Sequence, residues 1–246
     1  MAFLIYGINP VSEALRSDRC RITEVWIAEG RSFKGLEGII SMVESKGVPL
    51  RRVGRSQLDS LTKDALHQGV VGSIEQFAYA DLDAVLQQDQ GEPFLLVLDG
   101  IEDPRNLGAL IRTADACGVW GVIIPKDRAV GITPAVAKSS AGALFHVPVV
   151  RVTNIATTLR QIKERGIWVV GAAAEAQTDL FHHDLTIPLA VVIGGEGRGM
   201  RPLVKRECDL LVSIPMKGKV NSLNASVAGS IILYEVIRQR GSTHRP

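Results

Sequence analysis

The stretch IPMKGKVNSLNASVAGSIILYE, residues 214–235, indicates the kind of fold and site that this chain forms. It continues an apolar run at 210–214 that Pro215 closes, and it passes through a loop rich in lysine and glycine, residues 216–220. Polar residues then crowd the start of an apolar helix: Asn221, Ser222, Asn224 and Ser226. Such side chains are poor in helix interiors because they compete for backbone hydrogen bonds. They therefore cap the helix or bind a ligand, and capping is the simpler interpretation for Ser222 alone.

Length and composition are those of an ordinary globular protein. The 246 residues suffice for one large domain or two smaller ones. Apolar residues make up 46% and charged residues 22% of the chain. No window approaches the roughly 18 apolar residues of a membrane span. The N-terminal MAFLIYGINP lacks a basic region and is typical of a strand rather than a signal peptide. We expect a protein without membrane association.

Cysteines and histidines give no sign of a metal site. Cys20, Cys117 and Cys208 are odd in number and far apart, which favours reduced thiols in a cytoplasmic protein. None lies in a CxxC pattern and no HExxH pattern occurs, so we expect no metal. The adjacent His182 and His183 are interpreted as a solvated loop pair.

Charge is distributed unevenly along the chain. The net charge of +2 is too small to mark a nucleic-acid-binding protein. Residues 1–92 hold 10 lysines and arginines against 13 acidic residues, whereas residues 93–246 hold 18 against 13. The basic C-terminal part is compatible with a polyanionic partner.

Residues 1–77 are predicted to form a separate small domain of α/β/α type. Apolar strands are predicted at 3–6, 22–28, 48–53 and 70–74, and helices are predicted after Asn9, across 36–43 and from Ser56 to Leu61. Asn9 is the expected cap of the first helix, with Pro10 in its first turn. One basic cluster stands out: Arg51, Arg52 and Arg55. It is either a solvated surface or an RNA contact. The polar residues 78–92 form the expected linker.

Residues 93–246 alternate between apolar strands and helices. The strands are predicted at 94–98, 119–124, 146–150, 167–171, 190–193 and 210–214, and the helices include 107–116, 155–164 and 202–206. Continuous runs of valine, isoleucine and leucine between helices predict a parallel sheet covered on both faces. Ligands of such sheets bind beyond the carboxyl ends of the strands. Residues 139–143, SSAGA, predict close helix packing.

Two further segments follow strand ends, as 214–235 does. In DGIEDPRNLGALIR, residues 99–112, Asp103 or Asn106 can cap a helix. Arg112 lies about 200° from Leu110 on that helix, at ~100° per residue, and so off its apolar stripe. In GGEGRGM, residues 194–200, four glycines permit close backbone approach. This loop matches neither GxGxxG nor a GKS/T phosphate loop.

Three segments in this order resemble the motifs of a known family. They are DPRNLGALIRTADACG at 103–118, IGGEGRGM at 193–200 and IPMKGKVNSLNASVA at 214–228. They are similar to the motifs of the SpoU/TrmH family, the RNA ribose 2′-O-methyltransferases of the SPOUT class. The similarity covers the whole domain from about residue 93, and residues 1–77 resemble the small ribosomal-protein-like RNA-binding domain of the RlmB branch.

The resemblance implies a fold, a reaction and a set of residues. It implies a trefoil knot in the parallel-sheet domain and a homodimer with active sites near the subunit interface. It implies methyl transfer from S-adenosylmethionine to a guanosine ribose in the peptidyl-transferase region of 23S ribosomal RNA. The implied catalytic residues are Asn106, Arg112, Glu196, Ser222 and Asn224. The implied cofactor contacts are Gly171, Gly194, Gly195, Ile214, Met216 and Leu223.

The roles of these residues follow from the chemistry of the reaction. The 2′-hydroxyl must lose a proton as its oxygen attacks the methyl group. Either a neighbour lowers the affinity of Arg112 for its proton so that Arg112 acts as the base, or Arg112 stays charged and clamps the target phosphate. Glu196 is expected to orient Arg112 or backbone N–H groups, and Asn106 and Asn224 to hold the ribose or the arginine. Plain helix capping stays an alternative for Asn106.

Other functions compete with this interpretation. The same reaction on tRNA is one, and a non-catalytic RNA-binding factor of ribosome assembly is another. A nucleotide-binding enzyme that uses residues 193–200 as a phosphate loop is a third. Ser222 has no His–Asp pair nearby in sequence, which disfavours a hydrolase.

Overall fold

The structure, a computed structural model, describes residues 3–30, 35–89 and 91–242. Its contacts divide the chain into two compact units. The first comprises residues 1–78 and 132–146, and the second comprises residues 79–131 and 147–246.

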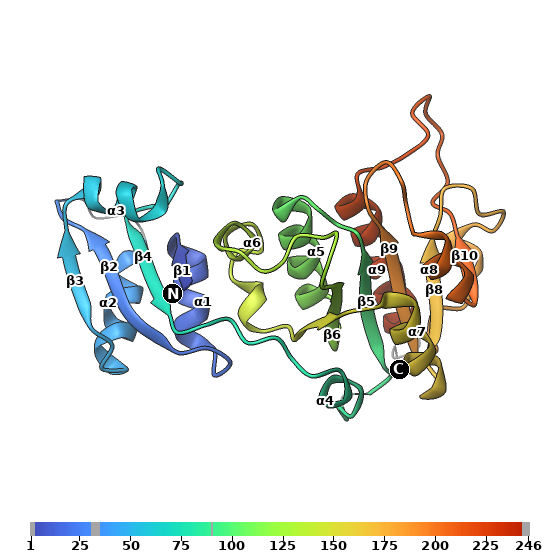
Figure 1. Ribbon diagram of the computed structural model, residues 1–246, viewed down its shortest axis with the longest axis horizontal. Coiled ribbons are helices and arrows are strands. Elements are labelled where there is room, and N and C mark those ends of the chain that lie inside the picture. Colours follow the sequence, from blue (N-terminus) through green and yellow to red (C-terminus); the bar gives the residue numbers. More distant parts are fainter. Residues whose placement is uncertain (1–2, 31–34, 90, 243–246) are drawn as a thin grey trace. The chain divides into compact units, whose positions relative to one another are not determined.

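The first unit is built on a mixed sheet of four strands with the order β1-β4-β2-β3. The strands are β1 (Phe3–Tyr6), β2 (Ile22–Ala28), β3 (Leu50–Val53) and β4 (Val70–Ile74). β4 runs antiparallel to β1 and β2, and β2 runs parallel to β3 (Figure 1). Three helices accompany the sheet: α1 (Ile8–Arg16), α2 (Leu36–Ser45) and α3 (Arg55–Thr62).

The helices of the first unit lie on opposite faces of its sheet. Gly72 of β4 faces Val11 of α1, and α1 packs against α2. The neighbouring Val71 points to the other face because side chains alternate along a strand. There it packs with Leu58 of α3 and with Val53. The α/β/α arrangement predicted for this part of the chain is confirmed.

The start of α1 differs from the prediction. The helix begins at Ile8 with Gly7 as its cap, so Asn9 lies inside the first turn and the prediction that Asn9 is the cap was wrong. Gly7 has a φ of 98°, a value that favours glycine. A Cβ at Gly7 would also overlap the side chain of Lys138. The conformation of this glycine, rather than an asparagine side chain, sets the helix start.

Residues 132–146 belong to the first unit by their contacts. They form α6 (Pro134–Ser139) and the 3-10 turn η1 (Ala143–Phe145). Gly142, at a φ of 93°, approaches α1 so closely that a Cβ there would lie 2.8 Å from Cγ of Glu13. Ser17 Oγ donates a buried hydrogen bond of 2.5 Å to the carbonyl oxygen of Phe145. The close packing predicted for residues 139–143 is present.

The second unit holds a six-stranded sheet in the order β10-β8-β9-β5-β6-β7, and each neighbouring pair is parallel. Its strands are β5 (Phe94–Asp99), β6 (Gly121–Pro125), β7 (Val149–Val152), β8 (Trp168–Ala172), β9 (Leu189–Gly194) and β10 (Leu210–Val212). Its helices are α4 (Leu82–Leu86), α5 (Pro104–Ala116), α7 (Ile155–Glu164), the 3-10 turn η2 (Leu180–His182), α8 (Pro202–Glu207) and α9 (Ala225–Ser242).

Helices cover both faces of this sheet, as predicted. On one face Val85 of α4, Leu159 of α7 and Val204 of α8 join a continuous apolar core with inward side chains of the strands. On the other face α5 and α9 pack together over β9 (Figure 1). Gly229 of α9 allows this close approach, because a Cβ there would overlap Leu110 of α5 and lie 3.4 Å from Ile193 of β9. The core fixes the carboxyl ends of β5, β8, β9 and β10 side by side.

No helix among the described residues is long and apolar enough to cross a bilayer.

Candidate active site

A cavity of about 700 Å³ opens at the carboxyl ends of β8, β9 and β10. Parts of residues 172–175, 193–200 and 212–228 line it, together with Lys205. Two of these segments are the glycine loop and the stretch before α9 that the sequence singled out. The cavity lies where ligands of open parallel sheets bind.

The glycine loop follows β9 and closes tightly on itself. Gly199 N–H donates to the carbonyl oxygen of Gly195 at 3.0 Å, and Arg198 N–H donates to that of Glu196 at 3.0 Å. A Cβ at Gly194 would overlap the backbone of Gly199, and a Cβ at Gly195 would overlap the carbonyl oxygen of Gly100. Both positions therefore require glycine, and their backbone atoms lie open to the cavity.

A polar network joins the glycine loop to the start of α9. Asn224 Oδ1 accepts from the N–H groups of Ser226 at 2.9 Å and Val227 at 3.3 Å, so Asn224 caps the helix. Its Nδ2 donates to Glu196 Oε1 at 2.8 Å. Ser222 lies before the helix and lines the cavity. The interpretation of Ser222 as the helix cap was therefore wrong.

Asn106 completes this network from α5. Its Nδ2 donates to Glu196 Oε1, and its Oδ1 accepts from Asn224 Nδ2 at 3.1 Å. Asp103 caps α5 by accepting from Arg105 N–H at 2.7 Å. The alternative that Asn106 is merely a helix cap was thus wrong. Residues 90 and 118 positions apart in the sequence meet in one amide–carboxylate cluster.

Arg112 does not join this cluster. It lies on α5 between the buried Ile111 and the partly buried Thr113, its own side chain is exposed, and it does not line the cavity. Within the described parts of the chain, it makes no hydrogen bond or ion pair. The next residue, Thr113, hydrogen-bonds Ser230 of α9 at 2.9 Å. Arg112 is therefore free to contact a group from outside its own chain.

Most of the residues that the resemblance implies as cofactor contacts line the cavity. They are Gly194, Gly195, Ile214, Met216 and Leu223. Gly171 directly precedes Ala172, which lines the cavity. A Cβ at Gly171 would overlap Cys208 and Met200. Met216 and Leu223 are exposed by 39% and 37%, so apolar side chains remain open to a ligand. The lining combines such side chains with open backbone, as a cofactor with an apolar and a polar part requires.

Two ion pairs near the cavity were not predicted from the sequence. Lys205 Nζ contacts Glu175 Oε1, and both residues line the cavity. This hydrogen bond lowers the pKa of the Glu175 carboxyl. Asp99, the last residue of β5, is buried and pairs with Arg201 just beyond the glycine loop. The only sequence signal for the Asp99–Arg201 pair was the position of Asp99 at a strand end, directly before Gly100.

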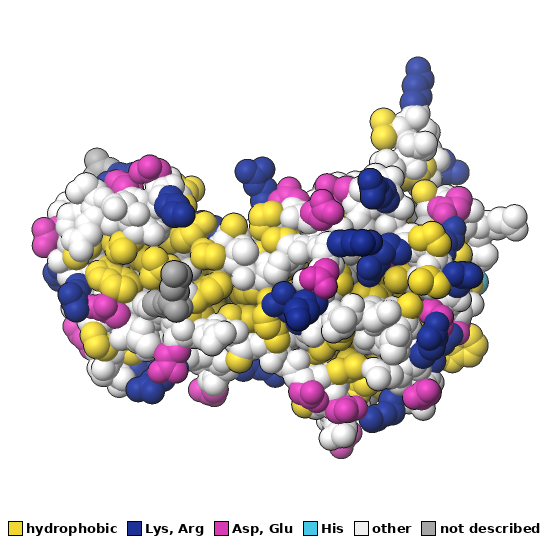
Figure 2. All heavy atoms as spheres, viewed as in Figure 1, with side chains coloured by type: hydrophobic (Ala, Val, Ile, Leu, Met, Phe, Trp, Pro, Cys, Tyr) yellow, Lys and Arg dark blue, Asp and Glu magenta, His cyan; other side chains and the backbone are white. Residues whose placement is uncertain are grey.

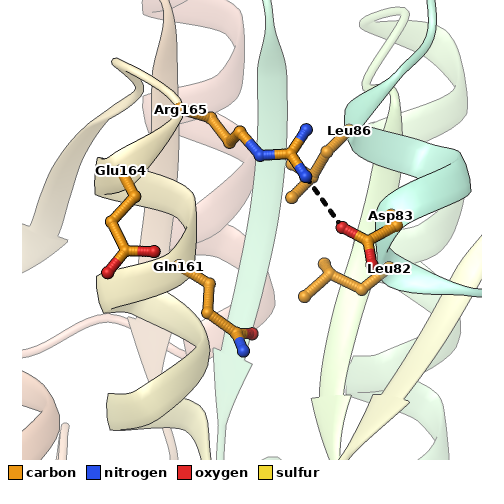
Figure 3. A pocket seen from close by; sticks show the side chains of 6 residues that line it. All are labelled: Leu82, Asp83, Leu86, Gln161, Glu164 and Arg165. Atoms are coloured by element: carbon orange, nitrogen blue, oxygen red, sulfur yellow. Dashed lines mark hydrogen bonds and ion pairs between the residues drawn. The ribbon is translucent and has the colours of Figure 1, made fainter.

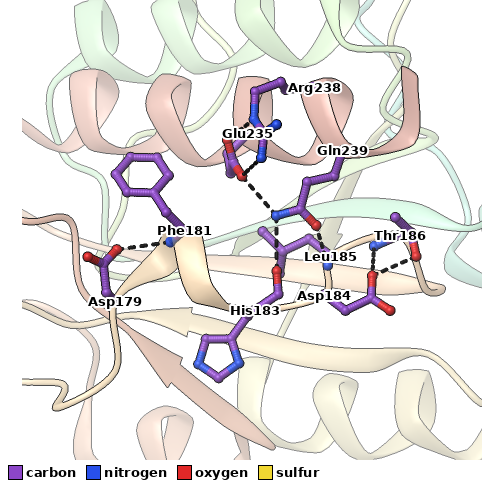
Figure 4. Close-up of polar contacts among 9 residues, drawn as sticks. All are labelled: Asp179, Phe181, His183, Asp184, Leu185, Thr186, Glu235, Arg238 and Gln239. Atoms are coloured by element: carbon purple, nitrogen blue, oxygen red, sulfur yellow. Dashed lines mark hydrogen bonds and ion pairs between the residues drawn. The ribbon is translucent and has the colours of Figure 1, made fainter. Parts of the chain in front are cut away.

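Helix α9 is anchored near its C-terminal end by partly buried polar contacts (Figure 4). Gln239 Nε2 donates to the carbonyl oxygen of His183 at 3.0 Å and to Glu235 Oε1 at 2.8 Å. Gln239 Oε1 accepts from Leu185 N–H at 2.8 Å. Hydrogen bonds from Arg238 lower the pKa of the Glu235 carboxyl. The helix that carries Asn224 at its start is thus fixed to the loop after β8.

The basic cluster of the first unit is exposed, but two of its three members have acidic partners. Arg51 pairs with Glu24, and Arg55 lies 4.0 Å from Asp59. Arg52 forms no ion pair with a described residue. Its guanidinium is the one in this cluster that is open to an anion.

A second cavity and the three cysteines show no sign of a catalytic role. A cavity of about 210 Å³ between α4 and α7 is crossed by the Arg165–Asp83 ion pair of 2.9 Å (Figure 3). Burial raises the pKa of the Cys20 and Cys117 thiols to about 11 and that of Cys208 to about 12, so none is an activated nucleophile. Among residues 3–30, 35–89 and 91–242, no three His, Cys, Asp or Glu side chains gather as a metal site would need.

Comparison with known proteins identifies the family. Residues 93–234 match the model of the SpoU rRNA Methylase family. The chain belongs to the SpoU rRNA methylase family. Residues 4–80 match a second model, described as RNA 2′-O ribose methyltransferase substrate binding. The resemblance and the α/β parallel-sheet fold that it implied are confirmed, whereas the trefoil knot stays a prediction.

Relatives match this SpoU methylase along nearly its whole length. The 23S rRNA (guanosine-2′-O-)-methyltransferase RlmB of Photorhabdus laumondii is 46% identical and covers 98% of this chain and 100% of its own. That of Pseudomonas syringae is 43% identical and covers 98% of both chains. The SpoU methyltransferase AviRb from Streptomyces viridochromogenes, solved with AdoMet, superposes with a TM-score of 0.84 at 29% identity, covering 98% of this chain and 91% of its own.

Proposed function

We propose that this SpoU methylase transfers a methyl group from S-adenosylmethionine to the 2′-oxygen of a guanosine in 23S ribosomal RNA. The observation that carries the proposal is the cluster of Asn106, Glu196 and Asn224 beside a cavity at the sheet's carboxyl edge. Full-length relatives at 43–46% identity that are named for this reaction support the substrate. The protein acts in the cytoplasm, on the large ribosomal subunit.

The cavity suits S-adenosylmethionine. Gly194 and Gly195 leave backbone atoms uncovered, and Ile214 and Leu223 offer apolar contact. When bound, the cofactor supplies an electrophilic methyl group on a sulfonium. The protein's part is to fix the geometry of an in-line displacement, since positioning supplies much of the acceleration in such reactions. Glu196 accepts hydrogen bonds from two amide donors and lines the cavity.

Arg112 is proposed to clamp the target phosphate. Its guanidinium is exposed and without a partner among the described residues, so it is available to RNA. A role as base would require the guanidinium, which is almost never neutral in proteins, to lose its proton. A charged Arg112 beside the reacting sugar would instead stabilise negative charge as it develops.

Cations without a described acidic partner follow the carboxyl ends of several strands of the second unit. Six lie in loops or first helical turns directly after strand ends and have no acidic partner within the described residues: Arg105, Lys126, Arg128, Arg198, Lys217 and Lys219. The loop that follows β10 extends from the unit and ends in a basic tip (Figures 1 and 2). By contrast, Arg160 and Lys163 of α7 are paired with Glu207 and Asp209. The free cations fit a polyanion that crosses the carboxyl edge.

Removing two of these cations is expected to flatten the salt dependence of RNA binding. In Lys126→Gln/Arg128→Gln, the slope of log K against log salt should fall by roughly 1.4–1.8, at about 0.7–0.9 per lost phosphate contact. The measurement is fluorescence anisotropy with an rRNA fragment from 50 to 200 mM salt. The matched control is Arg160→Gln/Lys163→Gln, which removes two cations that are already paired. Equal slopes for wild type and the first variant would refute this RNA contact.

We also propose a domain division and a dimer. Residues 1–77 bind RNA, and Arg52 is the free cation of the cluster Arg51, Arg52 and Arg55. Residues 78–92 connect this domain to residues 93–246, which form the methyltransferase domain.

An apolar stripe on α9 supports a homodimer: Val227 and Tyr234, seven residues apart, are 47% and 55% exposed. Arg112 borders this stripe through the Thr113–Ser230 bond.

The dimer is tested by sedimentation velocity. Val227→Asp/Tyr234→Asp should convert wild-type dimers into monomers, because two buried carboxylates would face each other across the two-fold axis. Trp168→Asp, at an equally exposed apolar residue on β8, is the control and should stay dimeric. A monomeric wild type would contradict the dimer.

The reaction is tested on ribosomal RNA. Purified protein, S-adenosylmethionine with a labelled methyl group and unmodified 23S rRNA should yield one 2′-O-methylguanosine, located by nuclease digestion and mass spectrometry. Label in tRNA alone would exclude the ribosomal substrate, and no label in any RNA would exclude a methyltransferase.

A further inference from the structure

One carboxylate outside the cavity is held by an unusually complete set of contacts. Asp99 ends β5, and its side chain is fully buried. Its Oδ2 accepts from Arg201 N–H at 2.7 Å, and its Oδ1 accepts from Arg201 Nε at 2.7 Å. Arg201 Nη2 lies 2.5 Å from the same Oδ1, while 43% of the arginine side chain stays exposed. The geometry is that of a two-pronged, charge-assisted pair.

The backbone of Asp99 holds the other end of the same loop. Its carbonyl oxygen accepts from Gly195 N–H at 2.9 Å. Both ends of the loop are therefore bonded to the same residue of β5. Gly195, at its start, bonds the carbonyl group of Asp99, and Arg201, directly after residue 200, bonds the carboxylate of Asp99. Four residues of this loop that line the cavity are glycine or glutamate: Gly195, Glu196, Gly197 and Gly199.

Anchoring at Asp99 limits the conformational freedom that the glycines give this loop. Glycines allow close approach to a ligand, but they also give the free loop many conformations that binding must restrict. Asp99 and Arg201 restrict them before any ligand arrives. Removing the Arg201 side chain would leave the buried Asp99 carboxyl group with the backbone N–H of residue 201 as its remaining partner from this loop, which is costly for a buried polar group.

We propose that Asp99 is a positioning residue that, with Arg201, fixes the glycine loop for cofactor binding and for the contact of Glu196 with Asn106 and Asn224. The inference rests on the proposed function of the same cavity. Asp99 does not line the cavity, so its effect passes through the loop. Preorganisation of this kind raises affinity by removing the ordering cost from the binding step.

The test measures binding of S-adenosylhomocysteine by calorimetry and amide exchange of residues 195–200 by mass spectrometry. Asp99→Asn and Arg201→Met should raise the Kd at least tenfold and speed exchange in this loop ahead of the rest of the sheet. Arg201→Lys should recover part of the affinity, since it keeps the charge but not the fork. The KM for the methyl donor should rise by a similar factor, and the KM for RNA by less than threefold.

The control is Arg160→Met. Arg160 of α7 also makes two contacts to one carboxylate, that of Glu207 at the end of α8. Removing it should leave the Kd for S-adenosylhomocysteine unchanged. Should Asp99→Asn fail to fold, the two Arg201 variants carry the test. Affinity within twofold of wild type in both, or faster exchange spread over the whole sheet, would overturn the inference. A wild type that fails to bind S-adenosylhomocysteine would instead refute the proposed function.

Discussion

Replacing Glu196 by glutamine is expected to lower kcat roughly 10- to 150-fold while the Kd for S-adenosylhomocysteine stays within about threefold of wild type. The amide oxygen of glutamine can still accept from Asn106 and Asn224, so the network keeps its shape. What is lost is the charge, and hydrogen bonds to a charged group contribute about 1.5–3 kcal/mol. Single-turnover methylation measures the rate, and calorimetry measures the binding.

A second carboxylate in the same cavity provides the control for this experiment. Glu175 pairs with Lys205 and makes no contact with the amide cluster. Glu175→Gln should therefore retain kcat within about threefold, because only an exposed ion pair is lost. Equal rate losses in the two variants would show that the cavity needs negative charge in general rather than Glu196 in its place.

Replacing Gly195 by alanine is expected to weaken cofactor binding by roughly 100-fold. The added Cβ would overlap the carbonyl oxygen of Gly100, which is backbone and cannot rotate away. Overpacking of this kind costs about 1–3 kcal/mol, and the loop must shift to relieve it. The shift moves the backbone that faces the cavity, so the loss should appear in the Kd for S-adenosylhomocysteine.

Gly218 is the matched control for this substitution. It lies in the exposed loop after β10, where a Cβ would meet no atom within 4 Å. Gly218→Ala should bind the ligand as wild type does, and both variants should keep a single thermal transition in scanning calorimetry. Unchanged affinity in Gly195→Ala would contradict the proposed role of the loop backbone.

The sequence predicted regular elements well where a single physical signal determines them. Helix 155–164 was placed at its true ends, because its apolar residues recur at helical spacing and Asn154 caps it. The strand predicted at 146–150 starts at Val149 instead, since residues 143–145 turn into a 3-10 helix. Helix α6 was not predicted, because its six residues, PAVAKS, are too few to show a helical repeat of apolar side chains.

The site could be predicted as a set of residues but not as an arrangement. The resemblance to the family motifs pointed to Glu196 and Asn224, yet nothing in the sequence shows that one carboxylate oxygen accepts from two asparagines. The same holds for Asp99 and Arg201, which are 102 residues apart and meet only because β5 and β9 are neighbours. Arg112 illustrates the opposite case: the resemblance implied a catalytic role, whereas its side chain makes no hydrogen bond or ion pair with the described residues.

The packing of residues 132–146 against α1 bears on how the protein can be cut for study. A fragment that ends near residue 78 would lose the buried carbonyl partner of Ser17, and the glycine surface at 142 on which α1 rests would be missing. The complementary fragment would expose Leu144 and Phe145 to solvent or to aggregation. Expression of the first unit alone should therefore include a designed replacement for residues 132–146, or the chain should be kept whole.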